Sequence, residues 1–328
     1  MNPARGVSST KTIPAVFHKE GSTLHPLWIT GFSDAEASFG LDFVRKSSSR
    51  TGWQILPVFK IHLHKKDLAL LQQIQSYFNN LAQESGQECH GHFLVSGDMA
   101  MWRVGSMAEL NHVILPHFDK YPLITKKLAD YLLFRDAVKL MRNKEHLNLD
   151  GLGKIVNIKA SLNLGLSDEL QAVFPNTIKV NRPVVKSQAV PHGMWMAGFT
   201  SGEGCFLVSI FKSTTTKLGY TSRLRFSVTQ HSRDELLLRN FVTYFACGRY
   251  SSRTSGAAGD FLCSNFSDIV EKIIPFFDEY PIMGSKLKDY DDWKKVAELM
   301  TSKAHLQAEG LDNIRKISTG MNRGRLQD

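Results

Sequence analysis

The sequence predicts an α+β fold in which one αββαββα unit occurs twice, so that a single chain forms a pseudo-two-fold pair of halves. The first observation is a repeated segment: residues 28–39 and 195–206 both contain Trp, Gly-Phe, Glu and a closing Phe in the same order. The second is that each segment leads into alternating apolar and polar residues, the pattern of a strand with one buried face. The third is that Trp28 and Trp195 are as far apart as Phe59 and Phe226, so the repeat continues beyond the first strand.

The elements of the first copy follow from the spacing of its apolar residues. Pro26 suits the first turn of a helix, and the nearly continuous apolar character of 27–36 predicts a helix buried on most sides. Gly31 and Ala35 lie about one turn apart and would let another backbone approach closely. The elements expected after this helix are strands at 39–46 and 53–64, a helix at 66–81, strands at 89–95 and 99–104, and helices at 106–115, 125–142 and 152–162.

The second half repeats the same order of predicted helices and strands, with recognisable residues at equivalent positions. Residues 115–122 and 274–281, for example, share Pro, Phe, Asp, Tyr and Pro at matching positions. The offset in residue number between these later segments is smaller than the offset between Trp28 and Trp195. The second copy is therefore expected to be shorter around its third and fourth strands. The predicted organisation is a flexible N-terminal arm (1–23), an N-terminal half (24–164), a polar, proline-containing linker (165–190) and a C-terminal half (191–328).

Composition limits the function classes. A chain of 328 residues can bury two separate cores. The net charge of +9 and a pI near 9.3 favour an anionic partner, nucleic acid ahead of a membrane surface, although a merely basic soluble enzyme explains the charge equally well. The four cysteines form no CxxC pair, which favours a reducing compartment. We expect no membrane span and no signal peptide, because the apolar runs are too short.

Two carboxylates stand out because the repeat retains them. Glu36 and Glu203 each fall in the last turn of a mostly apolar helix, where the helix dipole disfavours an anion by roughly 0.3–1 kcal/mol. If the small-residue faces of the two helices pack together, the acids lie side by side, and they then need a cation or a proton between them. One such Glu alone would be read as a solvated helix end; two aligned copies favour a site for a hard cation such as Mg²⁺. Asp34, whose counterpart is Ser201, suits a capping or packing role better.

The polar faces of the predicted strands carry hydrogen-bond donors at every second residue. A two-stranded ribbon fits the major groove of DNA, where such side chains read base edges. For any single residue, a solvated outer face is at least as good an explanation. The positions expected to face DNA are Ser38, Gly40, Asp42, Val44, Lys46, Lys60 and His62 in the first copy, and Cys205, Leu207, Ser209, Phe211, Arg223, Arg225, Ser227, Thr229, Arg249, Ser251 and Arg253 in the second.

Ile29-Thr-Gly-Phe-Ser-Asp-Ala-Glu-Ala37 and Met196-Ala-Gly-Phe-Thr-Ser-Gly-Glu-Gly204 resemble the two motifs of single-chain LAGLIDADG homing endonucleases. The resemblance extends over nearly the whole chain beyond the N-terminal arm. It implies an intron-encoded, Mg²⁺-dependent endonuclease of an organelle, here a mitochondrion, that acts as a monomer on double-stranded DNA. The motif helices would join the halves, and two antiparallel four-stranded sheets would form a saddle over a long, nearly asymmetric target that is cut to leave 3′ overhangs.

The same resemblance assigns roles at the site. Glu36 and Glu203 are the expected metal ligands, each serving one strand, with Mn²⁺ or Ca²⁺ as substitutes for Mg²⁺. The residues before them complete the expected metal site, Ala35 and Gly202. Gln230 matches a glutamine that orients water, and the corresponding residue of the first copy is Leu63, so the two centres should be unequal. The basic residues expected near the cleaved phosphates are Lys126, Lys127 and Lys286.

Other functions explain the sequence less well. An RNA maturase of the same fold, bound to its host intron RNA with cleavage reduced or lost, remains the main alternative. A transcription regulator leaves the paired acids unexplained. Residues 201–206 follow a helix rather than a strand, which argues against a dinucleotide-binding loop. Cys89, His90 and His92 lack a partner cluster for a transition metal, and His62 and His64 are more simply polar-face residues.

Overall fold

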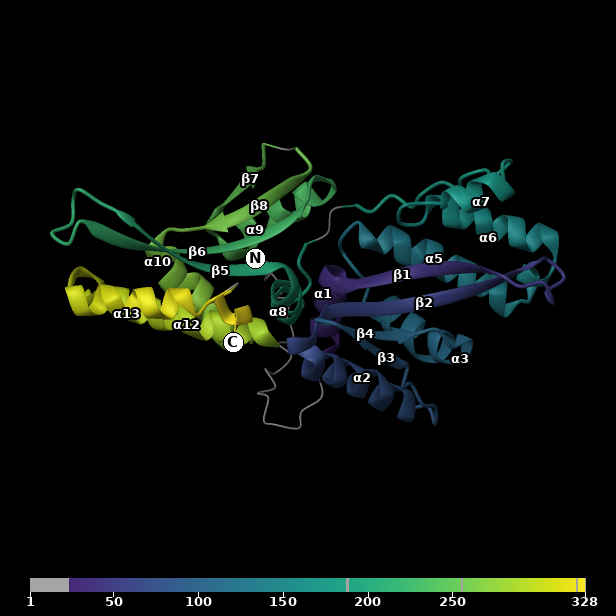
Figure 1. Cartoon of the computed structure of the whole chain (residues 1–328), viewed down its shortest axis with the longest axis horizontal. Helices are drawn as coiled ribbons and strands as arrows, with labels where there is room; N and C mark the ends of the chain where they lie inside the picture. The colour runs from purple at the N-terminus through teal and green to yellow at the C-terminus, as the bar shows by residue number, and fades with distance from the viewer. Residues whose placement is uncertain (1–23, 187–188, 255, 323, 328) are drawn as a thin grey trace, which may run out of the picture.

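The structure is a computed structural model that describes residues 24–186, 189–254, 256–322 and 324–327. The predicted N-terminal arm therefore lies outside the described residues. The chain folds as two similar halves that extend in opposite directions from a central helix pair (Figure 1). The predicted duplicated α+β architecture is confirmed.

The first half begins with the motif helix and continues as predicted through two strand pairs. Its elements are α1 (Pro26–Glu36), β1 (Ala37–Arg45), β2 (Trp53–His64), α2 (Leu68–Gln83), β3 (His92–Ser96), β4 (Met99–Val104), α3 (Met107–Glu109), α4 (Leu115–Lys120), α5 (Lys127–Arg142) and α6 (Leu149–Ser161). A π-helical stretch, Leu110–Ile114, joins α3 to α4. The helix predicted at 106–115 is therefore longer than expected and contains an extra residue in one turn.

The second half repeats this order, including the π-helical stretch at Ile269–Ile273. Its elements are α8 (Gly193–Glu203), β5 (Gly204–Lys212), β6 (Tyr220–His231), α9 (Glu235–Phe245), β7 (Arg249–Ser252), β8 (Ala258–Cys263), α10 (Phe266–Asp268), α11 (Ile274–Glu279), α12 (Ser285–Thr301) and α13 (Ala308–Thr319).

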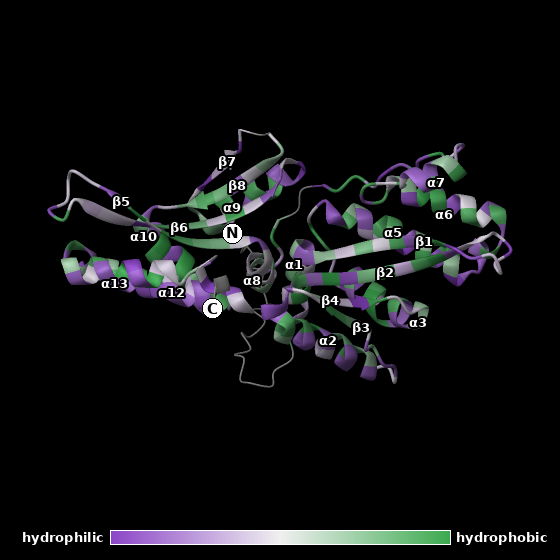
Figure 2. Ribbon diagram, viewed as in Figure 1, coloured by the Kyte–Doolittle hydropathy of each residue, from purple (hydrophilic) through white to green (hydrophobic). Residues whose placement is uncertain are grey.

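Each half contains one antiparallel four-stranded sheet, with strand orders β1-β2-β4-β3 and β5-β6-β8-β7. One face of each sheet packs on its own hydrophobic core, in which Phe39 and Phe59 of the first half correspond to Phe206 and Phe226 of the second. The covering helices are amphipathic, and apolar residues alternate with polar ones along α2 and α12 (Figure 2). None of the helices in the described part of the chain is long and apolar enough to cross a membrane.

The central contact is between α1 and α8, and it depends on glycine. A Cβ atom placed on Gly31 would lie 2.0 Å from the carbonyl oxygen of Trp195, and one on Gly198 would lie 2.1 Å from that of Trp28. Gly202 faces the Cβ of Ala35 in the same way, at 2.4 Å. The small-residue interface predicted from the repeated motif is confirmed, and the two helix backbones touch without side chains between them.

The strands start directly where the motif helices end. β1 begins at Ala37 and β5 at Gly204, with no loop after either glutamate. β1 therefore spans 37–45 rather than the predicted 39–46, and Lys46 lies just beyond the strand in the hairpin turn. The sheets are consequently attached rigidly to the helix ends that carry Glu36 and Glu203.

The connection between the halves is more ordered than a flexible linker. It contains a short helix, α7 (Asp168–Val173), and is fastened to the first half. Arg182 forms an ion pair with the buried Asp130, with Nη2 and Oδ2 2.6 Å apart, and Val185 is itself buried. The polar segment predicted as a linker at 165–190 therefore contains residues that have specific partners in the first half.

Asp34 joins three parts of the molecule at this interface. Its carboxylate accepts hydrogen bonds from the amides of Ile124 (3.0 Å) and Thr125 (3.2 Å), from the hydroxyl of Thr125 (2.6 Å) and from Nε1 of Trp195 (3.0 Å). Burial raises the pKa of Asp34 to about 6, although the hydrogen bonds oppose this shift, so the group is ionised above neutral pH. The capping role expected from the sequence is confirmed.

Ser201, the residue equivalent to Asp34 in the second half, accepts only part of the corresponding hydrogen bonds. Ser201 accepts the amide of Met283 (3.1 Å), as Asp34 accepts that of Ile124. Nε1 of Trp28 is buried, and the described residues offer it no hydrogen-bond partner, whereas the equivalent Trp195 is paired with Asp34. The interface is therefore symmetric in backbone packing and asymmetric in its polar contacts.

We predict that Gly31→Ala lowers the free energy of unfolding by at least about 3 kcal/mol, because the added methyl group meets the backbone of α8 and cannot be accommodated by a rotamer change. Urea unfolding of purified protein measures this loss. Gly153→Ala in α6 is the matched control, since no atom lies within 4 Å of its added Cβ, and it should stabilise the protein by about 0.5–1 kcal/mol. Equal stability of the two variants would contradict the close backbone contact.

We also predict that Asp34→Ser destabilises the protein by at least about 2 kcal/mol at pH 8, because Nε1 of Trp195 and at least one loop amide lose their acceptor in a buried place. Thermal unfolding gives the comparison with Ser201→Ala, which removes the acceptor of a single amide and should cost less. A melting temperature of Asp34→Ser at or above that of Ser201→Ala would refute this assignment.

Candidate active site

The two motif helices deliver their glutamates to one place. A Cβ atom on Gly202 would lie 3.1 Å from both Cγ and Oε1 of Glu36, so the end of α8 touches that side chain. Burial, followed by the negative charge of Glu203, raises the pKa of Glu36. Burial likewise raises the pKa of Glu203. The structure thus brings together the two acids that the repeat singled out.

Two buried lysines share this place, one from each half. Nζ of Lys127 donates to the carbonyl oxygens of Ser33 (2.9 Å) and Ala35 (3.1 Å), and Nζ of Lys286 donates to that of Gly202. Burial lowers the pKa of both ammonium groups, while the charges of Glu36 and Glu203 act in the opposite direction. Each lysine therefore places a positive charge at the negative end of a motif helix, which offsets the unfavourable position of the acids there.

The third predicted lysine does not join them. Nζ of Lys126 donates to the carbonyl oxygen of Val185 at 2.7 Å, which directs its ammonium group to the linker. Its amide donates to Asp234 of the other half at 2.8 Å, just as the amide of Ser285 donates to Asp67 at 2.6 Å. Lys126 therefore belongs to a pair of contacts between the halves, and the structure removes it from the candidate catalytic residues.

Those contacts identify two residues that sequence reasoning missed. Asp67 and Asp234 follow β2 and β6 at equivalent positions, and each accepts the amide that precedes or begins the long helix of the opposite half. These two helices, α5 and α12, carry Lys127 and Lys286. The recurrence of an aspartate at the same place in both copies was the available signal, but it did not show that the partners lie across the interface.

The two centres differ in the residue that ends the second strand. The side-chain amide of Gln230 lies near Glu203 and opposes the rise that burial causes in the pKa of that acid. Leu63 stands at the equivalent position of the first half and, together with Glu36 and Lys286, lines a pocket of about 330 Å³. The inequality expected from the sequence is therefore present in the geometry: one acid has an amide partner and the other faces an apolar side chain.

The donor atoms at the site suit a hard divalent cation. They are carboxylate oxygens of Glu36 and Glu203, with the carbonyl oxygens of Ala35 and Gly202 at the ends of the same helices. These two carbonyl oxygens also accept hydrogen bonds from Lys127 and Lys286, so a cation would share them with the lysines. Among the described residues, no group of three or more His, Cys, Asp and Glu is arranged to hold a metal by itself, and this includes residues 89–92. A cation at the two acids would therefore complete its coordination with water and substrate oxygens.

The outer faces of the two sheets contain the positions predicted to contact DNA. Strand pairing places Ser38, Lys60, Arg103 and His92 in one row across the four strands of the first sheet. The corresponding row of the second sheet contains Cys205, Ser227, Leu262 and Arg249. The members contributed by β3, β4 and β8 were not predicted, because the register of these shorter strands does not follow from the local sequence pattern.

One predicted contact is already engaged within the protein. Arg253 lies just beyond β7, and its guanidinium pairs with Asp260 at 2.8 and 2.7 Å and donates to Thr229 at 2.9 Å. This network neutralises the charge of Arg253 and occupies the hydroxyl of Thr229. Both residues are consequently less available to a ligand than the alternation of the strands suggested.

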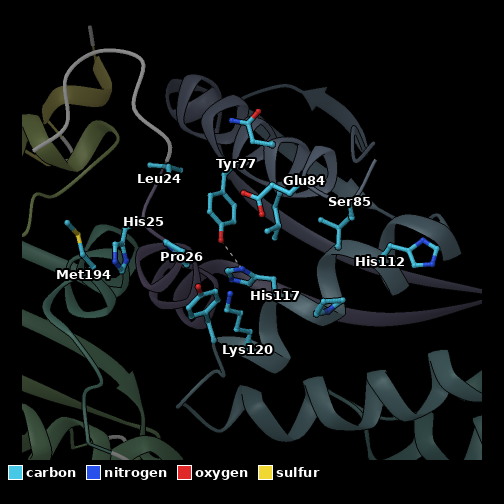
Figure 3. A pocket seen from close by; sticks show the side chains of 15 residues that line it. Leu24, His25, Pro26, Tyr77, Glu84, Ser85, His112, His117, Lys120 and Met194 are labelled. Carbon is cyan, nitrogen blue, oxygen red and sulfur yellow. Dashed lines mark hydrogen bonds between the residues drawn. The ribbon is translucent and has the colours of Figure 1, made fainter. Parts of the chain in front are cut away.

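A separate cavity of about 740 Å³ lies at the other end of α1. Tyr77 and His117 point toward one another in it (Figure 3), and the hydroxyl oxygen of Tyr77 is 3.0 Å from Nδ1 of His117. Burial lowers the pKa of His117 to about 3, so its ring is neutral. Pro26 lines this cavity and Glu36 ends the same helix about 15 Å away, which separates the cavity from the paired acids.

Comparison with known proteins agrees with this geometry. A sequence model described as LAGLIDADG endonuclease matches residues 29–138 and 196–297. A probable intron-encoded endonuclease of Neurospora crassa is 40% identical over 88% of this chain, which corresponds to 52% of that protein. A second one from the same organism is 38% identical over 91% of this chain and 65% of its own length. The chain thus spans about half to two thirds of these curated relatives.

Solved structures give a match over the full length of the compared protein. The homing endonuclease I-SmaMI bound to cleaved DNA is 44% identical and superposes with a TM-score of 0.88, covering 94% of this chain and 100% of the other. The same endonuclease bound to uncleaved DNA in the presence of calcium ions gives a TM-score of 0.86, over 91% of this chain and 99% of that one. On the two matched regions, which contain most of each motif helix and both glutamates, the chain belongs to the LAGLIDADG endonuclease family.

Proposed function

We propose that this chain is a site-specific endonuclease for double-stranded DNA that depends on a hard divalent cation, with Mg²⁺ as the natural choice. The observation that carries the proposal is the meeting of Glu36 and Glu203 with Lys127 and Lys286 where the two sheets begin. The chain covers the whole of a homing endonuclease that is solved with cleaved DNA, which supports the same activity here.

Each residue of the centre has a distinct task in this proposal. Glu36 and Glu203 would hold the cation, with Ala35 and Gly202 contributing backbone carbonyls. Bound there, the cation supplies charge stabilisation at the phosphate and lowers the pKa of a coordinated water. Gln230 keeps Glu203 oriented through its amide. Lys127 and Lys286 hold a positive charge beside the acids, where it stabilises the negative charge that develops on the cleaved phosphate.

In this proposal the outer faces of the sheets bind the DNA and set the position at which it is cut. The two sheets lie on opposite sides of α1 and α8 (Figure 1), and these helices end at Glu36 and Glu203. Duplex DNA that spans both sheets would therefore present its central phosphates to the two acids. The net charge of +9 favours this association. One chain carries both halves, and we therefore propose a monomer acting on a long, nearly asymmetric target and leaving 3′ overhangs.

The proposed setting is a mitochondrial intron, in line with relatives named as intron-encoded endonucleases. The host intron RNA is a further candidate ligand, since a maturase would use the same fold. Stimulation of splicing by the purified protein tests that role separately from DNA cleavage.

We predict that Glu36→Gln and Glu203→Gln each abolish double-strand cleavage, because either change removes a charged oxygen ligand from one of the two adjoining centres while keeping its shape, and cutting both strands requires both centres. The substrate is linear DNA that joins the two exon ends without the intron, with Mg²⁺ present. Gel analysis should show linear fragments for the unaltered protein and loss of at least about 10³-fold in rate for each variant.

Binding of the same DNA in Ca²⁺ controls for folding, since both variants should retain it. Glu235→Gln, on the exposed start of α9, is the matched control and should cut normally. Unchanged cleavage by both motif variants would exclude the proposed centre.

We further predict that the two DNA strands are cut at different rates, with the centre of Glu203 faster because Gln230 orients that acid. End-labelling each strand separately should reveal a nicked intermediate. Leu63→Gln should raise the rate at the slower strand, and Gln230→Leu should lower the rate at the faster strand by roughly 10-fold or more. Equal strand rates in the unaltered protein would show that this asymmetry has no catalytic effect.

A further inference from the structure

We infer that the two sheets read different base chemistry at equivalent positions: the N-terminal sheet recognises thymine methyl groups where the C-terminal sheet recognises guanines. This inference rests on the proposed function and specifies the substrate of the same surface. It follows from a comparison of equivalent positions on the two outer faces.

The central strands carry opposite chemistry at matched places. Leu56 of β2 pairs with Asp42, and Arg223 of β6 pairs with Ser209, which occupies the equivalent position of β5. Two residues further along, Val58 opposite Gly40 corresponds to Arg225 opposite Leu207. An apolar side chain in the first half is thus replaced by arginine in the second at both places, and of the two apolar side chains Leu56 is exposed while Val58 is buried.

The apolar character of the first face extends beyond the central strand. Val44, Leu56 and Leu94 point away from the core and are 46%, 38% and 49% exposed. They lie on three different strands. The equivalent of Val44 on the second face, Phe211, is also apolar and 38% exposed, so the contrast between the faces rests on Leu56, equivalent to Arg223, and Leu94, equivalent to Ser251. In the major groove the apolar group that such side chains can contact is the C5-methyl of thymine.

The arginines of the second face are placed for base edges. Arg223 and Arg225 are exposed on β6, in the part of that strand that pairs with β5 alone, before its pairing with β8 begins at Phe226. The guanidinium of Arg223 lies over the ring of Phe211, 4.9 Å from its centroid, which limits its conformations before DNA binds. A guanidinium held in this way can donate two hydrogen bonds to O6 and N7 of guanine.

The register also fixes where these contacts fall. Ser209 and Leu207 follow Glu203 by six and four residues along β5. At about 3.4 Å per residue, Arg223 and Arg225 lie roughly 20 and 14 Å from the acid. One base pair of DNA rises about 3.4 Å, so the guanines should lie about six and four base pairs from the cut.

Base analogues placed in one half-site at a time test the inference. The reference is the exon-junction duplex that the unaltered protein cleaves in Mg²⁺. Deoxyuridine in place of thymidine removes only the methyl group, and 7-deazaguanine in place of guanine removes only N7. We expect deoxyuridine to lower affinity severalfold in one half-site only, and 7-deazaguanine to lower it about 5- to 100-fold in the other only.

Variants assign each half-site to a half of the protein. Arg223→Leu, which installs the residue of the equivalent position in the first half, should abolish the effect of 7-deazaguanine at the outer guanine and leave the deoxyuridine effect unchanged. Arg225→Leu should do the same at the inner guanine. Arg239→Leu on helix α9 is the matched control, since it leaves the sheet face intact and should retain both effects.

The outcomes separate this inference from the proposed function. A protein that cuts no exon-junction DNA would remove the endonuclease proposal itself. Cleavage with equal sensitivity to both analogues in both half-sites, or 7-deazaguanine sensitivity that survives Arg223→Leu and Arg225→Leu, would overturn the division of base chemistry alone.

Discussion

The contact between α1 and α8 is the constraint on which the rest of the structure depends. Because Gly31 and Gly198 each face a carbonyl oxygen of the opposite helix, the two backbones have a single separation. The glutamates end these helices and the first strands begin at the next residue. One backbone contact therefore sets the distance between the two acids. It also sets the point from which both sheets extend.

Contacts between the halves then supply the charge that the acids require. Asp67 and Asp234 each accept an amide at the start of a long helix from the other half, and those helices carry Lys286 and Lys127. The lysines in turn donate to carbonyl oxygens at the ends of the motif helices. The centre is consequently assembled from both halves, and neither half contains it alone.

The extent to which the sequence predicted this arrangement depends on the range of the interactions. The motif helices, their small-residue faces and the paired acids were predictable because each repeats locally and its counterpart marks the same place. The partners of Asp67 and Lys126 were not, because they depend on how the two halves meet, which no local pattern records. The pairing of Arg253 with Asp260 was missed for a related reason: alternation gives the face of a residue but not its neighbours on that face.

A duplicated chain can also depart from its own symmetry where a homodimer cannot. The backbone contact at the interface needs glycine on both sides, and the chain has it on both sides. Away from that contact the equivalent positions differ: Leu63 and Gln230 beside the acids, and Leu56 and Arg223 on the sheets. A homodimer would have to place the same side chain in both positions and would match only a symmetric target. Since packing constrains the helix pair and leaves the outer faces of the strands free, the differences occur where they do not disturb the contact that positions both acids.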